Sequence, residues 1–515
     1  MPEQPEPSAR PLGPSRPSRP HRPHRPSARE LIDAVFDPGS FVSWDAPPLV
    51  VAEPGSEYAA DLEAAAAASG VDEAIVTGEG RIDGHRCAVI AGEFRFLAGS
   101  IGCAAAERIT LALERATRER LPLFAAPASG GTRMQEGTPA FVTMVKISAA
   151  LAAYKKRHLP YITYLRHPTT GGVLASWGSL GHVVVAEPGA TIGFLGARVY
   201  EALYGQPFPE GVQTAENFWA NGLVDAVLPL DACREAASRL LRLTMVPRDL
   251  DHVPEVPREE LPDEPAWASI SRSRRPDRPG VRALLRFGAD DVLSMHGTGA
   301  GETDRALLLA LVRFGEARCV VLGQDRRSER VEAPLSPSGL RVARRGMRLA
   351  TDLNLPLVSL IDTAGAALSK EAEEGGMAGE IARCLAEMVV LPVPTLCVLL
   401  GQGTGGGAIA LMPADRVISA QHSWLSPLPP EGASAILYRT SQRAPEMAER
   451  QRVRARDLLA DGIIDRIVAE HPDAADEPEA FCRRMARAIE HELVELTRQS
   501  TADRLEDRRA RFRSL

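Results

Sequence analysis

The chain has 515 residues with a formal net charge of −7 at pH 7, and 44% of its residues are hydrophobic. This length is too great for one hydrophobic core and suits two domains. The net negative charge gives no general attraction to nucleic acid or to acidic membranes, so we expect neither as a partner.

The cysteines and the apolar runs narrow the class of protein further. The seven cysteines are scattered without CxxC spacing, which argues against a zinc ribbon and against a disulfide framework. No apolar run approaches the length of a membrane span. We therefore expect a cytoplasmic protein with no bound metal.

The beginning of the chain predicts a tail followed by a first domain. Residues 1–27 are rich in Pro, Arg, Ser and His, a composition that cannot form a core and predicts disorder. The first domain is expected over residues 28–244. Its early predicted elements are a short helix with a turn (30–44), a hairpin that turns at Asp83-Gly84 (79–96), a helix (99–120) and a strand (121–126).

Two small-residue turns follow predicted strands in this domain. Gly130 and Gly131 lie in SGGTRMQE, and Gly171 and Gly172 lie in PTTGGVLAS. Glycine turns let the backbone approach a ligand closely and aim N–H groups at it. Ordinary helix capping explains the first turn equally well. A further strand and turn over 186–194 leads to the end of this domain.

The second part of the chain begins after a change in composition. Residues 245–280 are rich in Pro and in charged residues, which predicts an interdomain linker. The second domain is expected over residues 281–499, and a charged tail over 500–515. The predicted elements of this domain include a long helix (340–353), a strand (355–361), an acidic helix (370–390) and a second strand (395–400).

Three arginines lie near the start of the long helix, at positions 341, 344 and 345. A solvated basic face explains them, and so does contact with the phosphates of a ligand. The sequence leaves both interpretations open.

The most informative stretch is Thr395 to Leu411, TLCVLLGQGTGGGAIAL. It reads as an apolar strand, a glycine-rich turn from Gly401 to Gly407 and the start of a helix. The turn contains Gly401-x-Gly403-x-x-Gly406, the dinucleotide-binding spacing, which is a weak signal alone. No clear second strand with an acidic end follows about 20 residues on, as that site requires. We favour a turn that stabilises an oxyanion.

Most of the chain is duplicated. Three anchors recur in one order, with offsets of 234, 232 and 240 residues. A repeat of this kind predicts two homologous halves, each of alternating strands and helices, and hence an α/β fold with parallel strands. The paired anchors are Leu121-Pro122 with Leu355-Pro356, Leu159-Pro160 with Leu391-Pro392, and ANGLVDAVLP (220–229) with ADGIIDRIVA (460–469).

Longer motifs resemble a known family. SGGTRMQEG, PTTGGVLAS, AEPGATIGFLGARV and NGLVDAVLP resemble the β subunit of bacterial acetyl-CoA carboxylase carboxyltransferase. RRGMRLATDLNLPLVSLIDTAGA, GQGTGGGAIAL and PPEGASAIL resemble its α subunit. The resemblance covers about residues 30–495. It implies a fused carboxyltransferase with two crotonase-like (ββα spiral) domains in one chain.

The resemblance also implies an activity and partners. Members of this family move a carboxyl group from carboxybiotin to an acyl-CoA, typically acetyl-CoA giving malonyl-CoA for fatty acid synthesis. The chain would hold no covalently bound cofactor, because a separate biotin carboxyl carrier protein and a biotin carboxylase supply carboxybiotin. It would form at least a homodimer, since the family's site lies between the N-half and the C-half of different protomers.

The family chemistry assigns roles to the two Gly-Gly pairs. Carboxyl transfer passes through a thioester enolate and a biotin ureido enolate, and each anion needs preorganised donors. We expect Gly171 and Gly172 to serve the acyl-CoA enolate, and Gly406 and Gly407 to serve the ureido oxygen. The resemblance implies that biotin itself acts as the base. The further residues expected to bind substrate are Gly130, Gly131, Arg341, Arg344 and Arg345.

The sequence departs from the family in several places. The β subunit usually carries a zinc ribbon with four cysteines, which is missing here, so we expect no zinc. Ala364 stands where the family usually has proline. Gln402, Thr404 and Gly405 replace the usual Glu, Gly and Ser.

Several alternatives remain at this point. A carboxyltransferase for propionyl-CoA or another acyl-CoA, or one of a biotin-dependent decarboxylase, shares nearly every motif. A hydratase or isomerase of the same fold would normally need paired catalytic carboxylates and a single repeat. A non-catalytic subunit would be expected to lose the glycines, which are present.

Overall fold

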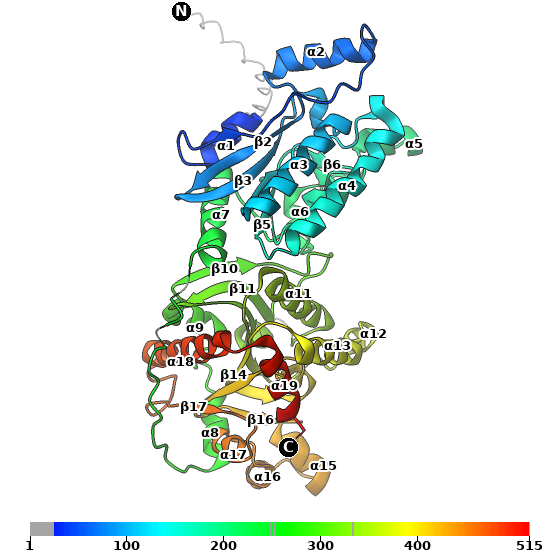
Figure 1. Ribbon diagram of the computed structural model, residues 1–515. Coiled ribbons are helices and arrows are strands. Elements are labelled where there is room, and N and C mark those ends of the chain that lie inside the picture. The colour runs from blue at the N-terminus through cyan, green and yellow to red at the C-terminus, as the bar shows by residue number, and fades with distance from the viewer. Residues whose placement is uncertain (1–24, 248, 252, 332–333, 514–515) are drawn as a thin grey trace, which may run out of the picture.

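The computed structural model describes residues 25–247, 249–251, 253–331 and 334–513, and shows two α/β halves stacked end to end (Figure 1). Residues 1–24 of the predicted tail lie outside this range. The strand order of the first sheet is β1 (Val42–Ser43), β2 (Ile75–Ile82), β3 (His85–Gly92), β4 (Leu123–Ala126), β5 (Tyr161–Leu165), β7 (Val183–Ala186) and β9 (Ala226–Val227).

The second sheet repeats this order. Its strands are β10 (Asp291–Met295), β11 (Leu307–Phe314), β12 (Ala317–Gln324), β13 (Leu357–Thr363), β14 (Thr395–Thr404), β15 (Arg416–Ala420) and β17 (Arg466–Val468). Short strands extend each half, where β6 (Thr169–Thr170) pairs with β8 (Ile192–Gly193), and β16 (Trp424–Ser426) pairs with β14.

Each sheet begins with three antiparallel strands, the last two of which form a hairpin, and continues with parallel strands. The β2–β3 hairpin turns at Asp83 and Gly84, whose φ angles of 49° and 79° suit the tight turn that matches strand twist. The β11–β12 hairpin turns at the corresponding Gly315 and Glu316. From β3 and β12 onward the neighbouring strands are parallel. The shared order confirms the two homologous α/β halves predicted from the repeats.

Helices cover the sheets of both halves (Figure 1). Those of the N-terminal half are α1 (Ala28–Val35), α2 (Glu57–Ser69), α3 (Cys103–Glu119), α4 (Gly137–Lys155), α5 (Ala197–Tyr204), α6 (Ala215–Ala220) and α7 (Leu230–Thr244). Those that follow are α8 (Ala266–Ser273), α9 (Val281–Gly288), α10 (Arg326–Val331), α11 (Pro337–Leu353), α12 (Lys370–Glu374), α13 (Met377–Val390), α14 (Gly405–Ile409), α15 (Pro430–Tyr438), α16 (Ala444–Arg450), α17 (Ala455–Ala460), α18 (Pro478–Arg498) and α19 (Thr501–Arg511).

The repeated Leu-Pro pairs mark where a long helix gives way to a strand. Helices α3 and α11 both end on a left-handed residue, Arg120 and Asn354. Leucine and proline follow each of these residues, and proline cannot continue a helix. The chain then enters β4 or β13.

One apolar core runs through both halves. Helix α7 contributes buried Leu240 and Leu241 to a cluster that also holds Val89 of β3 and Leu309 of β11. This helix packs on β10 and β11 of the second sheet. The two halves are therefore joined by buried apolar side chains as well as by the chain itself.

Two segments differ from their sequence-based expectation. The predicted linker, 245–280, contains helix α8 and a fully buried Arg278, which pairs with Glu470 at 2.6 Å. The predicted charged tail, 500–515, contains helix α19, whose Arg508 is 1% exposed. Both segments are rich in charge, but Arg278 and Arg508 are buried against carboxylates and carbonyls. The domain boundaries themselves stay predictions.

Candidate active site

In the N-terminal half, two turns meet at the carboxyl ends of β4 and β5. Ser129 donates its backbone N–H to Pro168 O at 2.7 Å, and Thr170 donates to Ser129 O at 3.0 Å. A Cβ at Gly171 would lie 3.3 Å from the Cα of Gly131. The turns therefore pack backbone to backbone, as expected where parallel strands end at one edge of a sheet. We call Gly171 and Gly172 the N-terminal glycine turn.

The hydrogen bonds of these glycines separate their roles. Gly130 N–H donates to Ala98 O at 2.9 Å, and Gly131 N–H donates to the Ser129 hydroxyl at 3.0 Å. Gly171 N–H donates to Gly193 O at 3.1 Å. Among the described residues, the N–H of Gly172 has no partner. Only one of the four glycines thus offers a free backbone donor.

The side chains around Gly172 come from the adjoining turn and helix. A Cβ at Gly172 would lie 3.2 Å from Thr132 Oγ1 and 3.7 Å from Met144 Sδ. Met144 is half-buried on α4. These two side chains close one side of the N-terminal glycine turn.

A buried arginine that the sequence did not single out holds this loop. Arg133 is fully buried and forms a bidentate pair with Glu73, with one contact at 2.9 Å. Although burial lowers the pKa of Arg133, the Glu73 carboxylate raises it overall above its ordinary value. The two residues lie far apart in sequence, so no local spacing points to the pair.

The C-terminal half repeats the arrangement. Gly365 N–H donates to the Thr363 hydroxyl at 3.0 Å, as Gly131 does to Ser129. A Cβ at Gly407 would lie 3.1 Å from the backbone nitrogen of Ala366. The turn after β13 and the turn after β14 are therefore in contact, and we call Gly406 and Gly407 the C-terminal glycine turn.

The C-terminal glycine turn starts later than the sequence suggests. Strand β14 runs to Thr404 instead of ending at Leu400, and Gly403 pairs with Leu425 of β16. The glycines of the dinucleotide-type spacing are therefore partly strand residues. Helix α14 then begins at Gly405. The predicted turn over 401–407 is shortened because β16 supplies a partner for the end of β14.

The free donors of this half lie at the start of α14. The N–H groups of Gly406 and Gly407 have no hydrogen-bond partner within the described part of the chain. The hydroxyl of Thr404, just before the helix, is also buried and unpartnered there. This cluster of unpaired polar groups suits a small polar ligand with an acceptor oxygen.

Two carboxyl groups, the buried Asp362 and the half-buried Glu329, lie behind the C-terminal glycine turn. Burial raises the pKa of Asp362, although the nearby Arg326 guanidinium, 3.4 Å away, opposes this shift. Burial also raises the pKa of Glu329 to about 7, and the charge of Asp362 adds to the effect. Glu329 Oε1 has no partner among the described residues.

The three arginines predicted to bind substrate are all held by carboxylates. Arg341 lies 3.0 Å from Glu302, and Arg344 contacts Glu387 at 2.5 Å. Arg345 reaches from α11 to the buried Asp225 of the N-terminal half at 2.9 Å. These contacts favour a structural role, and for Arg345 a role in joining the two halves.

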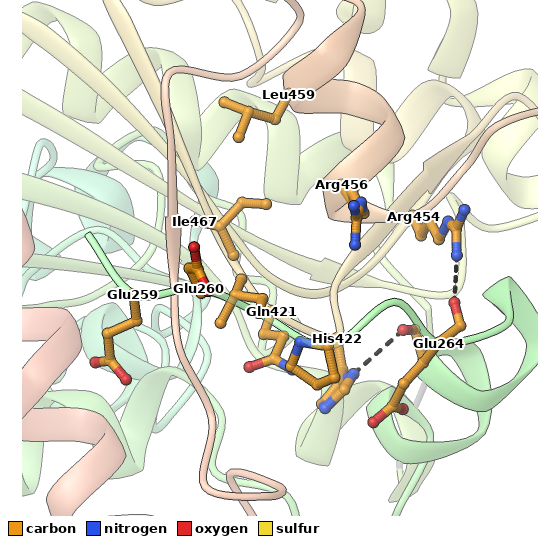
Figure 2. A pocket seen from close by; sticks show the side chains of 12 residues that line it. Glu259, Glu260, Glu264, Gln421, His422, Arg454, Arg456, Leu459 and Ile467 are labelled. Carbon is orange, nitrogen blue, oxygen red and sulfur yellow. Dashed lines mark hydrogen bonds between the residues drawn. The ribbon is translucent and has the colours of Figure 1, made fainter.

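A cavity of about 440 Å³ lies away from both glycine turns. It opens between the segment 259–264, the residues just after β15, helix α17 and strand β17, and Figure 2 shows glutamates and arginines around it. His422 Nδ1 lies 3.2 Å from the Ser269 hydroxyl at its wall. Some of the charged side chains around the cavity already have partners within the protein. Arg454, for example, contacts Asp263 at 3.0 Å.

The described residues hold no group of three or more His, Cys, Asp or Glu side chains placed to bind a metal ion. The expected lack of zinc stays a prediction. Within the same residues, none of the helices has the length and apolar character needed to span a bilayer.

Comparison with known proteins adds to this geometry. A family model described as the carboxyl transferase domain matches residues 21–504. A Mycobacterium tuberculosis (strain ATCC 25618 / H37Rv) protein named probable biotin-dependent acyl-coenzyme A carboxylase beta3 subunit is 57% identical over 486 residues, which is 94% of this chain and 98% of the relative.

A second relative and one solved structure extend the comparison. The acetyl-coenzyme A carboxylase carboxyl transferase subunits beta/alpha of Salinispora arenicola are 37% identical over 477 residues, 88% of this chain and 84% of that protein. The crystal structure of transcarboxylase 12S has a TM-score of 0.71 at 20% identity, covering 92% of this chain and 91% of the other. That structure has the same fold, in agreement with two crotonase-like halves.

Proposed function

We propose that this protein carboxylates acetyl-CoA to malonyl-CoA. The chain belongs to the carboxyl transferase domain family and is a biotin-dependent acyl-CoA carboxyltransferase. The observation that carries the site assignment is the duplicated glycine turn, with free backbone N–H groups in each half. The relatives named acetyl-coenzyme A carboxylase support the choice of acyl group.

The reaction needs two sets of hydrogen-bond donors. The carboxyl group leaves a ureido nitrogen of biotin and forms a bond to the α-carbon of the acyl-CoA, while the proton of that carbon passes to the biotin nitrogen. Negative charge develops on the thioester oxygen and on the ureido oxygen. Preorganised N–H groups stabilise such charge, and the loss of one donor costs roughly 10²–10³ in rate.

Each glycine turn can supply one set. We assign the Gly172 N–H to the thioester oxygen, and the N–H groups of Gly406 and Gly407 to the ureido oxygen. The N–H of Gly171 is engaged by Gly193, so Gly171 supports the turn through its packing. Room at the C-terminal glycine turn is narrow, because a Cβ at Gly406 would lie 2.6 Å from Ile381 Cδ1.

The biotin is expected on another chain. The sequence contains no Met-Lys-Met biotinylation motif, so a separate carrier protein would bring carboxybiotin, and a biotin carboxylase would recharge it. A cytoplasmic location stays a prediction from the sequence.

Exposed apolar side chains around each turn support assembly with a second copy. Phe141 and Val145 of α4 are 65% and 69% exposed, and Leu368 beyond Gly365 is 96% exposed. Such apolar surface marks an interaction site. We propose a two-fold arrangement in which the N-terminal glycine turn of one copy faces the C-terminal glycine turn of its partner. The related transcarboxylase 12S is described as a hexamer, and a larger ring of dimers would fit the same contact.

Substitution of one glycine in each turn tests the site. Neither Gly172 nor Gly407 has a positive φ angle, so valine tests the space rather than the backbone conformation. Gly407→Val should slow the breakdown of carboxybiotin in the absence of acyl-CoA by at least about 10²-fold. Gly172→Val should spare that partial reaction and abolish malonyl-CoA formation. The partial reaction measured with carboxylated carrier protein separates the two variants.

Each variant serves as the control for the other, after its unfolding transition has shown that it is folded. Two folded variants that lose both partial reactions equally, or lose neither, would contradict the assignment of one anion to each turn.

A panel of acyl-CoAs then tests which acyl-CoA is the substrate. We expect the highest kcat/KM with acetyl-CoA, and a preference for propionyl-CoA or a longer chain would replace that part of the proposal alone.

A further inference from the structure

A buried glutamine lies directly behind the C-terminal glycine turn. Gln324 ends β12 and is fully buried. Its Nε2 donates to the carbonyl oxygen of Gly407 at 2.7 Å, and its Oε1 accepts the backbone N–H of Asp362 at 3.2 Å. The side-chain amide therefore connects the turn after β14 to the end of β13.

The carbonyl of Gly407 depends on this contact. In a regular α-helix the N–H of Leu411 would bond to it, but Leu411 donates to Ala408 O at 3.2 Å instead. Helix α14 has only five residues, so its own hydrogen bonds hold it weakly. Without Gln324 a buried carbonyl would lose the one donor that the described structure gives it, which is costly.

Asp362 holds the beginning of the same segment. Its Oδ1 accepts the backbone N–H of Gln402 at 3.0 Å. Glycine at position 401 leaves room for this contact, because a Cβ there would lie only 2.3 Å from Asp362 Oδ1. Gln324 and Asp362 thus hold the two ends of residues 402–407.

The N-terminal half has a glycine where the C-terminal half has Gln324. Gly92 ends β3 where Gln324 ends β12, and a Cβ at Gly92 would lie 2.6 Å from Ala128 N. Arg166, six residues before Gly172 as Gly401 is before Gly407, donates to Gly92 O at 2.8 Å. A side-chain amide bonded to the glycine turn is thus a feature of the C-terminal half and not a requirement of the repeated fold.

We propose that Gln324 is a positioning residue for carboxybiotin chemistry. By holding the Gly407 carbonyl, it fixes the first turn of α14 and aims the N–H groups of Gly406 and Gly407 at the ureido oxygen. This role rests on the proposed function of the C-terminal glycine turn. It predicts that the reactivity of biotin, and not the binding of acyl-CoA, depends on the Gln324 amide.

The first test replaces Gln324 with methionine, which has nearly the same length and no N–H donor. Gln324→Met should slow acyl-CoA-independent breakdown of carboxybiotin about 10- to 100-fold and leave KM for acyl-CoA within about twofold. Hydrogen exchange, measured by mass spectrometry without any substrate, should become faster at the amides of Ala410 and Leu411, which donate to Gly406 O and Ala408 O. Both effects follow from a loosened turn.

The chain offers a matched control in Ser359→Ala. The buried Ser359 hydroxyl donates to Leu411 O at 2.7 Å, so this variant also removes a buried bond to the segment after β14. It should lower the unfolding temperature to a similar degree and keep the partial reaction within about threefold. A general loss of stability would affect both variants alike.

A second variant makes the hydrogen bond depend on pH. In Gln324→Glu the new carboxyl faces the Gly407 carbonyl and lies beside Asp362, so burial and like charge should keep its pKa high. Once protonated, it can donate to Gly407 O. The partial reaction should therefore recover, relative to the unmodified protein, as pH falls from 8 to 6. Gln324→Met should show no such recovery, because it carries no titratable group.

The outcomes separate this inference from the proposed function. If Gly407→Val is inactive in the partial reaction but Gln324→Met is as active as Ser359→Ala, the positioning role is wrong and the site assignment stands. If Gly407→Val keeps full activity, both fail. Should Gln324→Met not fold, a Gln324→Glu variant that folds and shows no recovery at low pH would overturn the inference by itself.

Discussion

At the scale of single residues, the hydrogen-bond partners of the backbone groups, more than the residue types, determine which glycines have an N–H free for a ligand. All four glycines of the N-terminal site look equivalent in sequence, yet only Gly172 keeps a free N–H among the described residues. Gly130, Gly131 and Gly171 are engaged by backbone or hydroxyl oxygens. Glycine permits close approach, and the hydrogen-bond partners then determine which N–H groups remain for a ligand.

Glu329 makes the stability of the C-terminal half depend on pH. Burial raises its pKa to about 7 from the ordinary 4.5, so the folded state binds this proton more tightly than the unfolded state. The contribution of the carboxyl to stability is fully present below about pH 4.5 and is lost as pH rises through 7. In Glu329→Gln the group stays neutral, so the free energy of unfolding relative to the unmodified protein should rise by up to about 3 kcal/mol between pH 5 and 8.

Urea unfolding at several pH values measures this difference. Glu371 provides the control, since it is exposed and the backbone N–H at its own position and the Ser369 hydroxyl lower its pKa. Glu371→Gln should not reproduce the rise. A difference between Glu329→Gln and the unmodified protein that stays constant with pH would show that Glu329 ionises normally in the folded state.

At the scale of elements, charged segments that look like connectors are parts of the packed structure. Helix α8 lies within the predicted linker and α19 within the predicted tail. Arginine makes this arrangement stable, because its planar guanidinium can satisfy several acceptors at once. Arg508, for example, donates to both oxygens of Asp415 at 2.8 Å and to the carbonyl of Met388 at 2.9 Å.

Loss of the Arg508 guanidinium should therefore destabilise the whole C-terminal half. Arg508→Met leaves Asp415, itself 7% exposed, without its cation, and removal of one partner of a buried ion pair costs roughly 3–5 kcal/mol. Arg509→Met is the matched control, because Arg509 is exposed on the same helix. Thermal unfolding should show a clear drop for the first variant and little change for the second. Equal unfolding temperatures would mean that α19 does not hold β15 in place.

At the scale of the whole molecule, duplication gives each chain one turn of each kind, on separate sheets. If the site forms between copies, a subunit with a damaged N-terminal turn and a subunit with a damaged C-terminal turn complement each other. Co-refolding or coexpression of Gly172→Val and Gly407→Val chains should then restore activity to about a quarter of the sites, since half of the dimers are mixed and one of their two sites is intact.

This complementation distinguishes a shared site from a site within one chain. In a single-chain site every copy carries one damaged turn, so mixing would restore nothing. Different affinity tags on the two chains, followed by copurification on both tags, confirm that mixed dimers formed. A folded mixture that assembles and stays inactive would contradict the two-fold arrangement.

The sequence by itself determined the class of fold, the duplication and the family. These depend on local patterns, namely strands that end in small-residue turns, Leu-Pro pairs after helices, and motifs that recur at a nearly constant offset. The hairpin at Asp83-Gly84 was predicted correctly for this reason, since two residues suffice to specify its turn. The same local signals located both glycine turns.

The tertiary structure alone decided which polar groups are held by partners within the protein and which stay free for a ligand. Arg133 finds Glu73 60 residues away, and Gln324 finds Gly407 83 residues away; neither pair leaves a spacing that a sequence pattern can show. Arg345 was predicted to bind a ligand, but in the structure it pairs with Asp225, which lies 120 residues away in sequence and in the other half. No sequence pattern indicated this ion pair. A buried polar group must find a partner wherever the fold brings one. Local sequence patterns therefore cannot predict which distant residue becomes that partner.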